Sequence, residues 1–402
     1  MKVLEINICH DQSTGGVMNG IADAVRHAGG VCLTASPPKA GYNEDFHYVI
    51  GNMFERRLNL IFGRLISNEF GLSHFSTKKL IARIEAEKPD IIHFHNLHAY
   101  YLDLPLLISY INKNKYKIVW TFHDCWPITG HCTHFQMVGC QKWISTCENC
   151  PQYKSYPGGL FDNAKRKFQN KKKLFSQLED LHIITPSKWL ADIVRQSYLG
   201  DKDIRVINNG IDLSIFRPRD SRFREQMVKG KKHMLLGVAS QWEYRKGIDI
   251  FNRLSEELPD EYAIVLVGTD SELEKSLCNN IIPIRKTKNP IELAEIYSAA
   301  DLFLNPTRED TFPTVNIESL ACGTPVLTFE TGGSPEIITQ ECGDSVPCDN
   351  YDLFKQKIIT ICEEKKYSEI DCIRRSQYYN KENKFFEYVE LYNEILEGRL
   401  NE

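Results

Sequence analysis

The chain has 402 residues, of which 42% are hydrophobic and 25% charged, and its formal net charge is −4. This length predicts two or three domains of ordinary size, and the slight excess of acid excludes a protein that attracts nucleic acid through its overall charge. No apolar run reaches the roughly 20 residues that span a bilayer, and the first residues lack the apolar core of a signal peptide, so we expect a cytoplasmic protein.

Short apolar segments alternate with helical patterns in the first half of the chain. The strand candidates are residues 2–8, 90–95, 116–122, 181–186 and 204–209. The polar segment 11–16, which contains two glycines, is predicted to be a loop. Residues 17–30 are predicted to form a helix that stops at Gly29 and Gly30.

The second half of the chain repeats this alternation. Its strand candidates are residues 233–240, 262–268, 301–306 and 324–329. Strands that alternate with helices predict parallel, doubly wound sheets, so we expect two Rossmann-like domains divided near residues 208–220. No G-x-G-x-x-G follows the first strand and no Walker A sequence is present, so we expect no organic cofactor.

A chemically distinctive segment follows the strand candidate 301–306. Thr307–Thr311 form the loop after that strand, and residues 314–323 form a helix. Ligands bind at the carboxyl ends of strands in open α/β sheets, and the free N–H groups of a helix start suit phosphate. Asp310 lies before the helix, and Glu318 within it is placed to accept hydrogen bonds from vicinal hydroxyls. In isolation, a helix cap and a solvated acid are the alternative interpretation.

This segment resembles the motif of retaining glycosyltransferases of the GT4 family, in which an acid, seven residues and a glutamate precede G-x-P-V. Asp310, Glu318 and the sequence CGTPV at 322–326 match that pattern, and residues 331–338 resemble the loop that closes over the donor. The resemblance implies that Glu318 binds the nucleotide ribose and that Asp310 lies beside the donor sugar. The family's first acid is usually glutamate, and a glycine is common where this chain has Pro313. These departures concern the contacts to the donor sugar.

Two segments of the first half extend the resemblance. Gly15 and Gly16 match the glycine-rich loop whose backbone approaches the donor phosphates, with an ordinary turn as the alternative. His123, in TFHDCW, matches a histidine near the donor sugar and the acceptor, with a structural hydrogen bond as the alternative.

The second half carries the remaining predicted donor-binding residues. Lys246 matches the family lysine that binds phosphate. Ser240 occupies the position of the family arginine, and Arg245 is the candidate to replace that charge. The backbone amides of Thr314 and Val315, at the helix start, complete the predicted site.

The resemblance implies an α/β protein with the GT-B fold, in which two Rossmann-like doubly wound parallel-sheet domains face each other across a cleft. We expect an acceptor domain at 1–205 with a cysteine-rich insertion at 124–160, a donor domain at 206–377, and a C-terminal helix at 378–402 that crosses back to the first domain.

The implied activity is that of a retaining hexosyltransferase of bacterial exopolysaccharide or capsule synthesis. It would move a sugar from UDP-sugar or GDP-sugar, its co-substrate, to a hydroxyl of a growing, lipid-linked polysaccharide. No D-x-D-like motif stands out, so we expect no catalytic divalent metal. The alternatives are a sugar-nucleotide epimerase or hydrolase on a similar scaffold, an inactive transferase, and a non-catalytic zinc-bearing binding protein.

The insertion contains a cysteine cluster, in a chain with thirteen cysteines. Cys132, Cys140, Cys147 and Cys150 have the spacing C-x7-C-x6-C-x2-C, which suits a structural tetrahedral zinc ion. The insertion is poor in aliphatic residues, so a metal is expected to replace a core. Free thiols, a redox C-x-x-C and an iron–sulfur cluster remain alternatives. Similar insertions occur in the colanic-acid-type subgroup of the family.

Two basic segments in the first half indicate peripheral contact with an anionic membrane surface. The first has apolar residues at helical spacing beside Arg56, Arg57 and Arg64, namely Phe54, Leu58, Ile61, Phe62, Leu65 and Ile66. The second contains Lys165, Arg166, Lys167, Lys171, Lys172 and Lys173. The alternative is an apolar stripe packed on the sheet and a solvated basic helix.

Overall fold

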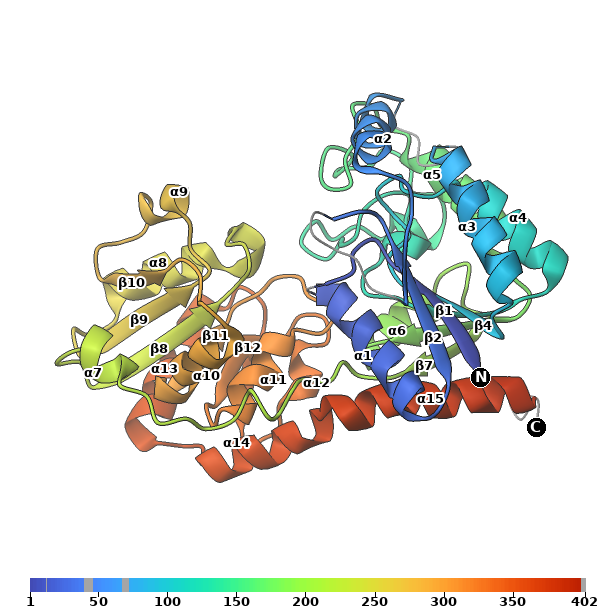
Figure 1. The fold of residues 1–402 in the computed structure, drawn as a ribbon. Helices are drawn as coiled ribbons and strands as arrows, with labels where there is room; N and C mark the ends of the chain where they lie inside the picture. Colours follow the sequence, from blue (N-terminus) through green and yellow to red (C-terminus); the bar gives the residue numbers. More distant parts are fainter. Residues whose placement is uncertain (12, 40–45, 67–71, 399–402) are drawn as a thin grey trace. The chain divides into compact units, whose positions relative to one another are not determined.

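The computed structural model describes the chain except residues 12, 40–45, 67–71 and 399–402 (Figure 1). The chain divides into two compact units. Unit 1 comprises Met1–Asn208 together with Glu382–Glu402, and unit 2 comprises Asn209–Lys381.

Unit 1 is built on a seven-stranded sheet of order β3-β2-β1-β4-β5-β6-β7, in which all neighbouring strands are parallel. The strands are β1 Lys2–Ile6, β2 Val31–Ser36, β3 His47–Val49, β4 Ile91–Phe94, β5 Lys117–Thr121, β6 Leu181–Thr185 and β7 Asp203–Val206. The central strands are apolar runs because parallel sheets are buried on both faces. The direction of strand order reverses between β1 and β4.

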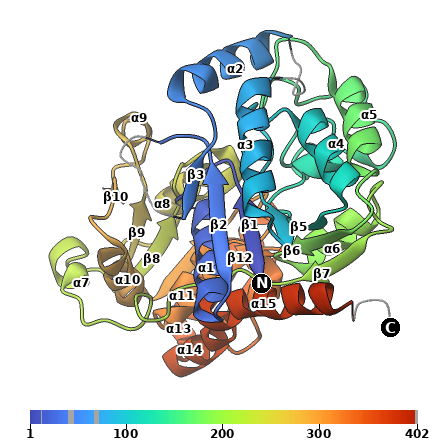
Figure 2. The same cartoon turned by 45° about the vertical axis from the view of Figure 1, so that its right-hand side comes forward.

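Helices cover both faces of this sheet (Figure 2). Buried residues of α3, α4, α5 and α6 pack on one face, and those of α1 and α15 pack on the other. The helices of unit 1 are α1 Ser13–His27, α2 Met53–Ile66, α3 His74–Glu87, α4 Leu104–Asn114, η1 Trp126–Ile128, η2 Lys142–Ile144, α5 Ala164–Phe175, α6 Lys188–Arg195 and α15 Lys381–Glu397.

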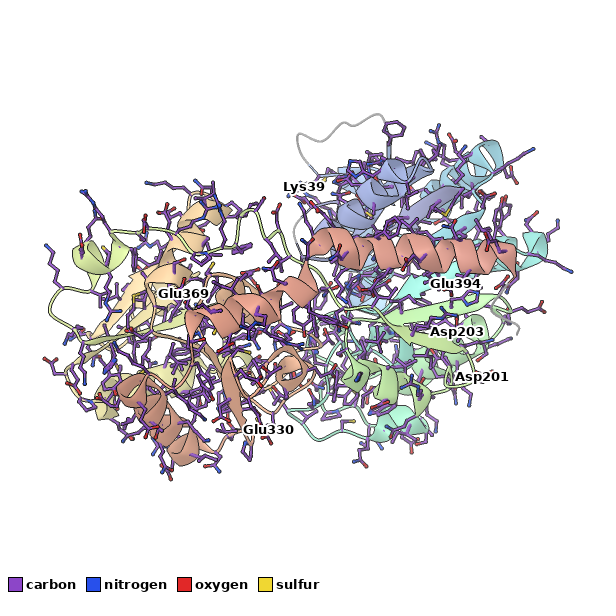
Figure 3. All side chains as sticks on the ribbon, turned by 90° about the horizontal axis from the view of Figure 1, so that it is seen from below. Lys39, Asp201, Asp203, Glu330, Glu369 and Glu394 are labelled. Atoms are coloured by element: carbon purple, nitrogen blue, oxygen red, sulfur yellow. The ribbon has the colours of Figure 1, made fainter. Side chains whose placement is uncertain are left out.

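The C-terminal helix α15 belongs to unit 1 from Glu382 onward. Its buried face includes Tyr388 and Tyr392, which join the core on the β1 side of the sheet. Arg205 on β7 donates to Glu394 at 2.7 Å and to Asp203 at 3.1 Å, and both acids are labelled in Figure 3. A helix that follows unit 2 in sequence is therefore part of the core of unit 1.

Unit 2 contains a six-stranded sheet of order β10-β9-β8-β11-β12-β13, again with parallel neighbours. Its strands are β8 His233–Val238, β9 Tyr262–Val267, β10 Ile281–Ile284, β11 Leu302–Asn305, β12 Val326–Phe329 and β13 Gly343–Val346. Its helices are α7 Phe223–Met227, η3 Tyr244–Lys246, α8 Ile248–Glu257, α9 Ser271–Glu274, α10 Pro290–Ala299, α11 Thr314–Ala321, α12 Ser334–Ile337, α13 Tyr351–Glu364, α14 Glu369–Ser376 and η4 Gln377–Tyr379. Two hydrophobic layers lie on opposite faces of this sheet.

The two doubly wound parallel sheets confirm the predicted fold class. Each strand candidate corresponds to an observed strand, but β2, β3, β10 and β13 were not predicted. β3, β10 and β13 lie at sheet edges, where strands are short and half-exposed. β3 and β13 lack a continuous apolar run, and β10 contains Pro283, which is unusual inside a strand. β2 is buried, but its polar Thr34 and Ser36 interrupt its apolar pattern.

Candidate functional site

The reversal of strand order in unit 2 lies between β8 and β11, where ligands bind in sheets of this kind. Lys246 ends η3 in the connection after β8, and Asp310 lies in the loop after β11. Lys246 Nζ is 2.5 Å from Asp310 Oδ2, and about a fifth of each side chain is exposed. The structure therefore joins the predicted phosphate-binding lysine and the predicted sugar-side acid in one ion pair.

Arg308 fixes the two loops that carry this pair. Its side chain is 4% exposed and contacts Asp249 at 2.8 Å through both terminal nitrogens and Asp349 at 2.7 Å. Its backbone N–H donates to the Arg245 carbonyl at 2.8 Å. Arg308 was not predicted as a site residue, although a charged side chain shortly after a buried strand was an available signal.

A close approach of two backbone segments requires glycine at position 332, in the 331–338 loop. Gly332 has φ +53°, and a Cβ atom there would lie 1.6 Å from the Asp310 carbonyl oxygen. Thr331 also donates to the Thr307 carbonyl at 2.6 Å. These contacts place the 331–338 loop against Asp310.

Glu318 lies on α11 and is half-buried. Tyr297 donates to Glu318 Oε2 at 3.2 Å, and burial raises the pKa of the Glu318 carboxyl to about 7. Thr314 and Val315 form the first turn of α11, and the preceding Pro313 offers no side-chain cap. The first-turn N–H groups thus have no capping side chain, as an anion site requires.

Arg245 is engaged by neighbouring groups in unit 2. Its Nη2 lies 2.7 Å from Glu243 Oε1, and its Nη1 donates to the Glu309 carbonyl at 3.1 Å. Ser240, the other position considered for phosphate binding, is exposed after β8. The Arg245 guanidinium therefore already has a carboxylate partner.

The predicted loop at 11–16 is wrong in part, because α1 begins at Ser13 and includes Gly15 and Gly16 in its first turn. A Cβ atom at Gly15 would lie 2.5 Å from the His10 carbonyl carbon, so packing excludes a side chain there. A Cβ atom at Gly16 would meet nothing within 4 Å. Polar Ser13 and Thr14 look like loop residues, yet they also favour helix starts.

His123 follows β5 in unit 1 and is half-buried. Its Nε2 is 2.9 Å from His95 Nδ1, and His95 Nε2 is 3.0 Å from Glu5 Oε2. Burial lowers the pKa of His123 to about 4, so its imidazole is neutral at pH 7. Glu5 and His95 were not predicted as site residues, although ionisable residues within the buried strand candidates 2–8 and 90–95 were an available signal.

His93 on β4 lies beside the hydrogen-bonded residues Glu5, His95 and His123. Among the described residues, Glu5, His93 and His95 form the one group whose three candidate metal-ligand atoms lie within 4.8 Å of one another. His93 Nδ1 is 2.6 Å from the Tyr392 hydroxyl, and its Nε2 is 2.8 Å from Thr121 Oγ1. Since both nitrogens of each histidine are engaged by protein groups, the group is a hydrogen-bond network.

The four cysteines of the predicted cluster line one small cavity of about 10 Å³. The Gly130 N–H donates to Cys147 Sγ at 3.1 Å. The expectation that the insertion lacks a core is wrong, because buried Phe135 and Trp143 stack with ring centroids 5.1 Å apart. Two aromatic side chains supply the apolar area that the missing aliphatic residues do not.

The apolar face of α2 is largely exposed rather than packed on the sheet. The exposed fractions are 72% for Phe54, 55% for Ile61, 50% for Phe62 and 47% for Leu65. The side chains of Arg64 and Ile66 lie outside the described residues. In the described part of the chain, no helix has the length and hydropathy needed to cross a membrane.

The basic surface predicted on α5 is smaller than expected. Lys167 and Lys171 are buried, while the other four basic side chains, Lys165, Arg166, Lys172 and Lys173, are exposed. Lys171 donates to the Trp126 carbonyl at 2.8 Å and lies 3.6 Å from the centre of the Trp126 ring. Helical periodicity turns Lys171 toward the core, where a carbonyl and a ring hold its charge.

Family models match both halves of the chain. The model for Glycosyltransferase Family 4 matches residues 33–215, and the model for Glycosyl transferases group 1 matches residues 232–364. A putative colanic acid biosynthesis glycosyl transferase, WcaC of Escherichia coli K12, is 26% identical over 64% of each chain. D-inositol 3-phosphate glycosyltransferase of Corynebacterium jeikeium is 25% identical over 54% of each chain. The chain thus matches about two thirds or less of the length of these relatives.

Solved structures share the fold over nearly the whole chain. Sucrose-phosphate synthase of Thermosynechococcus elongatus superposes with a TM-score of 0.71 at 16% identity, covering 99% of both chains. Anabaena Alr3699/HepE in complex with UDP-glucose gives a TM-score of 0.65 at 13% identity, covering 97% of this chain and 99% of that one. At these identities the likeness establishes the GT-B fold alone.

Proposed function

Because the chain belongs to the glycosyltransferase families that these two models describe, we propose that it transfers a sugar from a nucleotide-sugar donor to an acceptor hydroxyl, with retention of the anomeric configuration. The observation that carries the proposal is the constellation at the strand-order reversal of unit 2. The Lys246–Asp310 pair, the uncapped start of α11 and half-buried Glu318 all lie in unit 2, on the connections that follow β8 and β11.

The constellation matches the parts of a nucleotide sugar. Lys246 and the amides of Thr314 and Val315 would bind the diphosphate, whose leaving oxygen gains negative charge during transfer. Glu318 would accept hydrogen bonds from the ribose hydroxyls. Asp310 would face the sugar, and Arg245 would add charge only after it leaves Glu243.

Unit 1 would supply the acceptor side. We propose His123 as its catalytic side chain and the first turn of α1, with Gly15 and open Gly16, as a backbone surface for donor phosphates. The relative named for colanic acid biosynthesis supports a polysaccharide as the product. We propose a lipid-linked glycan as its acceptor. We propose a UDP-sugar or a GDP-sugar as the donor, and the neighbour solved with UDP-glucose makes a UDP-sugar the first to test.

Thermal unfolding with a panel of UDP, GDP and ADP and their sugar conjugates tests the donor site. A ligand at about 100 times its Kd adds about 2.7 kcal/mol to the free energy of unfolding. We expect stabilisation by one base family, followed by sugar transfer that requires an acceptor. Stabilisation by none of them would contradict the proposal, and donor consumption at the same rate without acceptor would indicate an epimerase or hydrolase.

Glu318 should make donor affinity depend on pH. Its pKa is about 7, so the carboxyl takes up a proton as the pH falls through 7 and accepts ribose hydrogen bonds less well. We expect UDP-glucose to bind with full affinity above pH 7 and progressively more weakly below it, by at most about tenfold per pH unit. Titration calorimetry across this range measures the effect.

The matched control is Glu318→Gln, whose amide does not titrate. It should bind more weakly than the wild type above pH 7 and show no dependence on pH. Tyr297 and Cys322, the titratable neighbours of Glu318, have pKa values raised by burial and stay neutral in this range. A pH dependence that survives in Glu318→Gln would remove the role of Glu318 at the ribose.

We also propose that the four cysteines hold a structural zinc ion. Cys147 Sγ accepts the Gly130 N–H hydrogen bond. Burial raises the pKa of the Cys132 thiol to about 12 and that of the Cys147 thiol to about 11, so zinc would have to displace both thiol protons on binding. Tetrahedral zinc at 2.3 Å requires sulfurs about 3.8 Å apart. No three sulfurs of the described cysteines lie within 4.8 Å of one another, so the side chains must rotate inward on binding.

Elemental analysis of tag-free protein should find one zinc ion per chain. Because metal binding contributes folding free energy, chelation should lower the melting temperature, and Cys150→Ala should lower it similarly. Cys362→Ala is the control for losing a buried thiol outside the insertion. It should keep its zinc, and chelation should lower its melting temperature as in the wild type, whereas the melting temperature of Cys150→Ala should not respond to chelator. Metal-free protein with full stability would overturn the proposal.

Finally, we propose that α2 and the exposed basic residues of α5 contact the anionic cytoplasmic membrane surface. The exposed apolar side chains of α2 supply the inserting face, and Arg57 on that helix is also exposed. Vesicle flotation should depend on anionic lipid and be lost in Phe54→Ser with Phe62→Ser. Equal binding by that double variant would contradict the contact.

A further inference from the structure

Three hydrogen-bonded side chains form a relay, the Glu5–His95–His123 relay, that runs from inside the sheet of unit 1 to His123. Glu5 on β1 contacts His95 at 3.0 Å, and His95 contacts His123 at 2.9 Å. Glu5 is 0% exposed and His95 is 1% exposed, whereas His123 is half-buried. Trp120 Nε1 donates to the His95 carbonyl at 2.8 Å and fixes the middle member. His123 is thus the outermost of the three.

Two proton arrangements satisfy both hydrogen bonds while the imidazoles stay neutral. If Glu5 is ionised, it accepts from His95 Nε2–H, and His95 Nδ1 accepts from His123 Nε2–H. The Nδ1 atom of His123 is then a hydrogen-bond acceptor. If Glu5 is protonated, it donates to His95 Nε2, His95 Nδ1–H donates to His123 Nε2, and His123 Nδ1 carries a hydrogen. The arrangements differ by one proton.

We propose that Glu5 and His95 are positioning residues that set the tautomer of His123 and receive, through it, the proton of the acceptor hydroxyl. This inference rests on the proposed transfer function. The acceptor O–H proton goes to His123 Nδ1, the His123 Nε2–H proton passes to His95 Nδ1, and the His95 Nε2–H proton passes to Glu5. The acceptor oxygen forms the glycosidic bond, and the donor phosphate leaves with the electron pair.

Burial explains why the proton ends on Glu5. A buried imidazolium is disfavoured, and burial lowers the pKa of both His95 and His123. The same burial raises the pKa of Glu5, which makes this carboxylate a better proton acceptor than an ordinary one. The His123 imidazole, with a pKa of about 4, is a weak base by itself. The relay couples it through His95 to the Glu5 carboxylate, which is a stronger base.

The charged and titratable groups around the Glu5–His95–His123 relay come from several elements. Cys32 on β2 donates from Sγ to Glu5 Oε1 at 3.4 Å. Arg26 and Asp23 on α1 form an ion pair at 3.0 Å, so their fields at Glu5 oppose each other. The other facing groups are His93 on β4, Tyr388 and Tyr392 on α15, and His98 and Asp124 beside His123.

Glu5→Gln tests the inference by kinetics. The near-isosteric amide keeps hydrogen bonds to Cys32 and His95 but accepts no proton, and it removes a buried charge, so we expect a folded protein. The wild-type kcat should rise with pH as Glu5, the proton acceptor of the Glu5–His95–His123 relay, loses its proton. The variant should lose about 100-fold or more in kcat with unchanged donor KM, and its kcat should not rise with pH.

Asp192→Asn is the matched acid-to-amide control, because Asp192 on α6 is exposed, pairs with Arg195 at 2.7 Å and is not among the charges that act on Glu5. It should retain the wild-type kcat and pH profile. Glu5→Gln with the wild-type kcat and pH profile would overturn the inference, since that outcome is the one a purely structural hydrogen bond predicts.

Nitrogen NMR of the histidine rings tests the proton chain without turnover. In the wild type, His95 should switch from the Nε2–H to the Nδ1–H tautomer as the pH falls, with no imidazolium signal. In Glu5→Gln it should stay in one tautomer. An imidazolium at His95, or a switch that persists in the variant, would overturn the inference. Absent transfer together with an intact switch would contradict the proposed function and leave the proton chain standing.

Discussion

Replacing Lys246 with alanine is expected to lower sugar transfer by about 100-fold to 1,000-fold, because the diphosphate would lose the lysine that we propose to bind it. The loss should appear in both donor affinity and kcat, since phosphate charge is present in the ground state and grows in the transition state. The Lys246–Asp310 pair is partly exposed, so its removal should change the free energy of unfolding by at most about 1 kcal/mol. Steady-state kinetics and thermal unfolding measure both effects.

The matched control is Lys275→Ala, which removes an exposed ion pair with Glu272 at 2.7 Å in the same unit. It should leave transfer unchanged. Near-normal turnover in folded Lys246→Ala would refute the phosphate role of this lysine.

The ion pair itself makes Asp310 informative. In the structure, the ammonium group of Lys246 donates a hydrogen bond to Asp310. We propose that the same ammonium group binds the donor phosphates, so Asp310 competes with them. Asp310→Asn should therefore bind UDP at least as tightly as the wild type, because a competing negative charge is gone. If Asp310 also stabilises the reacting sugar, the same variant loses kcat, and the two readouts move in opposite directions.

Replacing His123 with glutamine is expected to lower kcat by about 100-fold to 10,000-fold, the range for a group that transfers a proton in the transition state. UDP affinity should not change, because Lys246 and Glu318 lie in unit 2 and His123 in unit 1. Single-turnover kinetics and nucleotide titration separate these two quantities.

His27→Gln provides the control, since His27 is an exposed histidine in the last turn of α1. It should keep wild-type turnover. A His123→Gln enzyme with weakened UDP binding and unchanged kcat would assign His123 to donor binding and reject a role in proton transfer.

The donor-side residues were predictable because they lie in one contiguous segment. Asp310 and Glu318 are separated by seven residues and flank a helix start, so local spacing already places them near each other. The buried lysines of α5 were not predictable in this way. Composition marks Lys171 as part of a basic surface, and only the packing of α5 on Trp126 turns it inward.

The sequence by itself determined the two parallel α/β units, because alternating apolar strands and amphipathic helices encode a parallel sheet through local patterning. It also determined the residue types near the strand ends. The tertiary structure decided which of these residues meet. Lys246 pairs with Asp310 across 64 positions, and Glu5 reaches His95 across 90. Such contacts depend on strand order and register, which bring distant strand ends together and which no local pattern specifies.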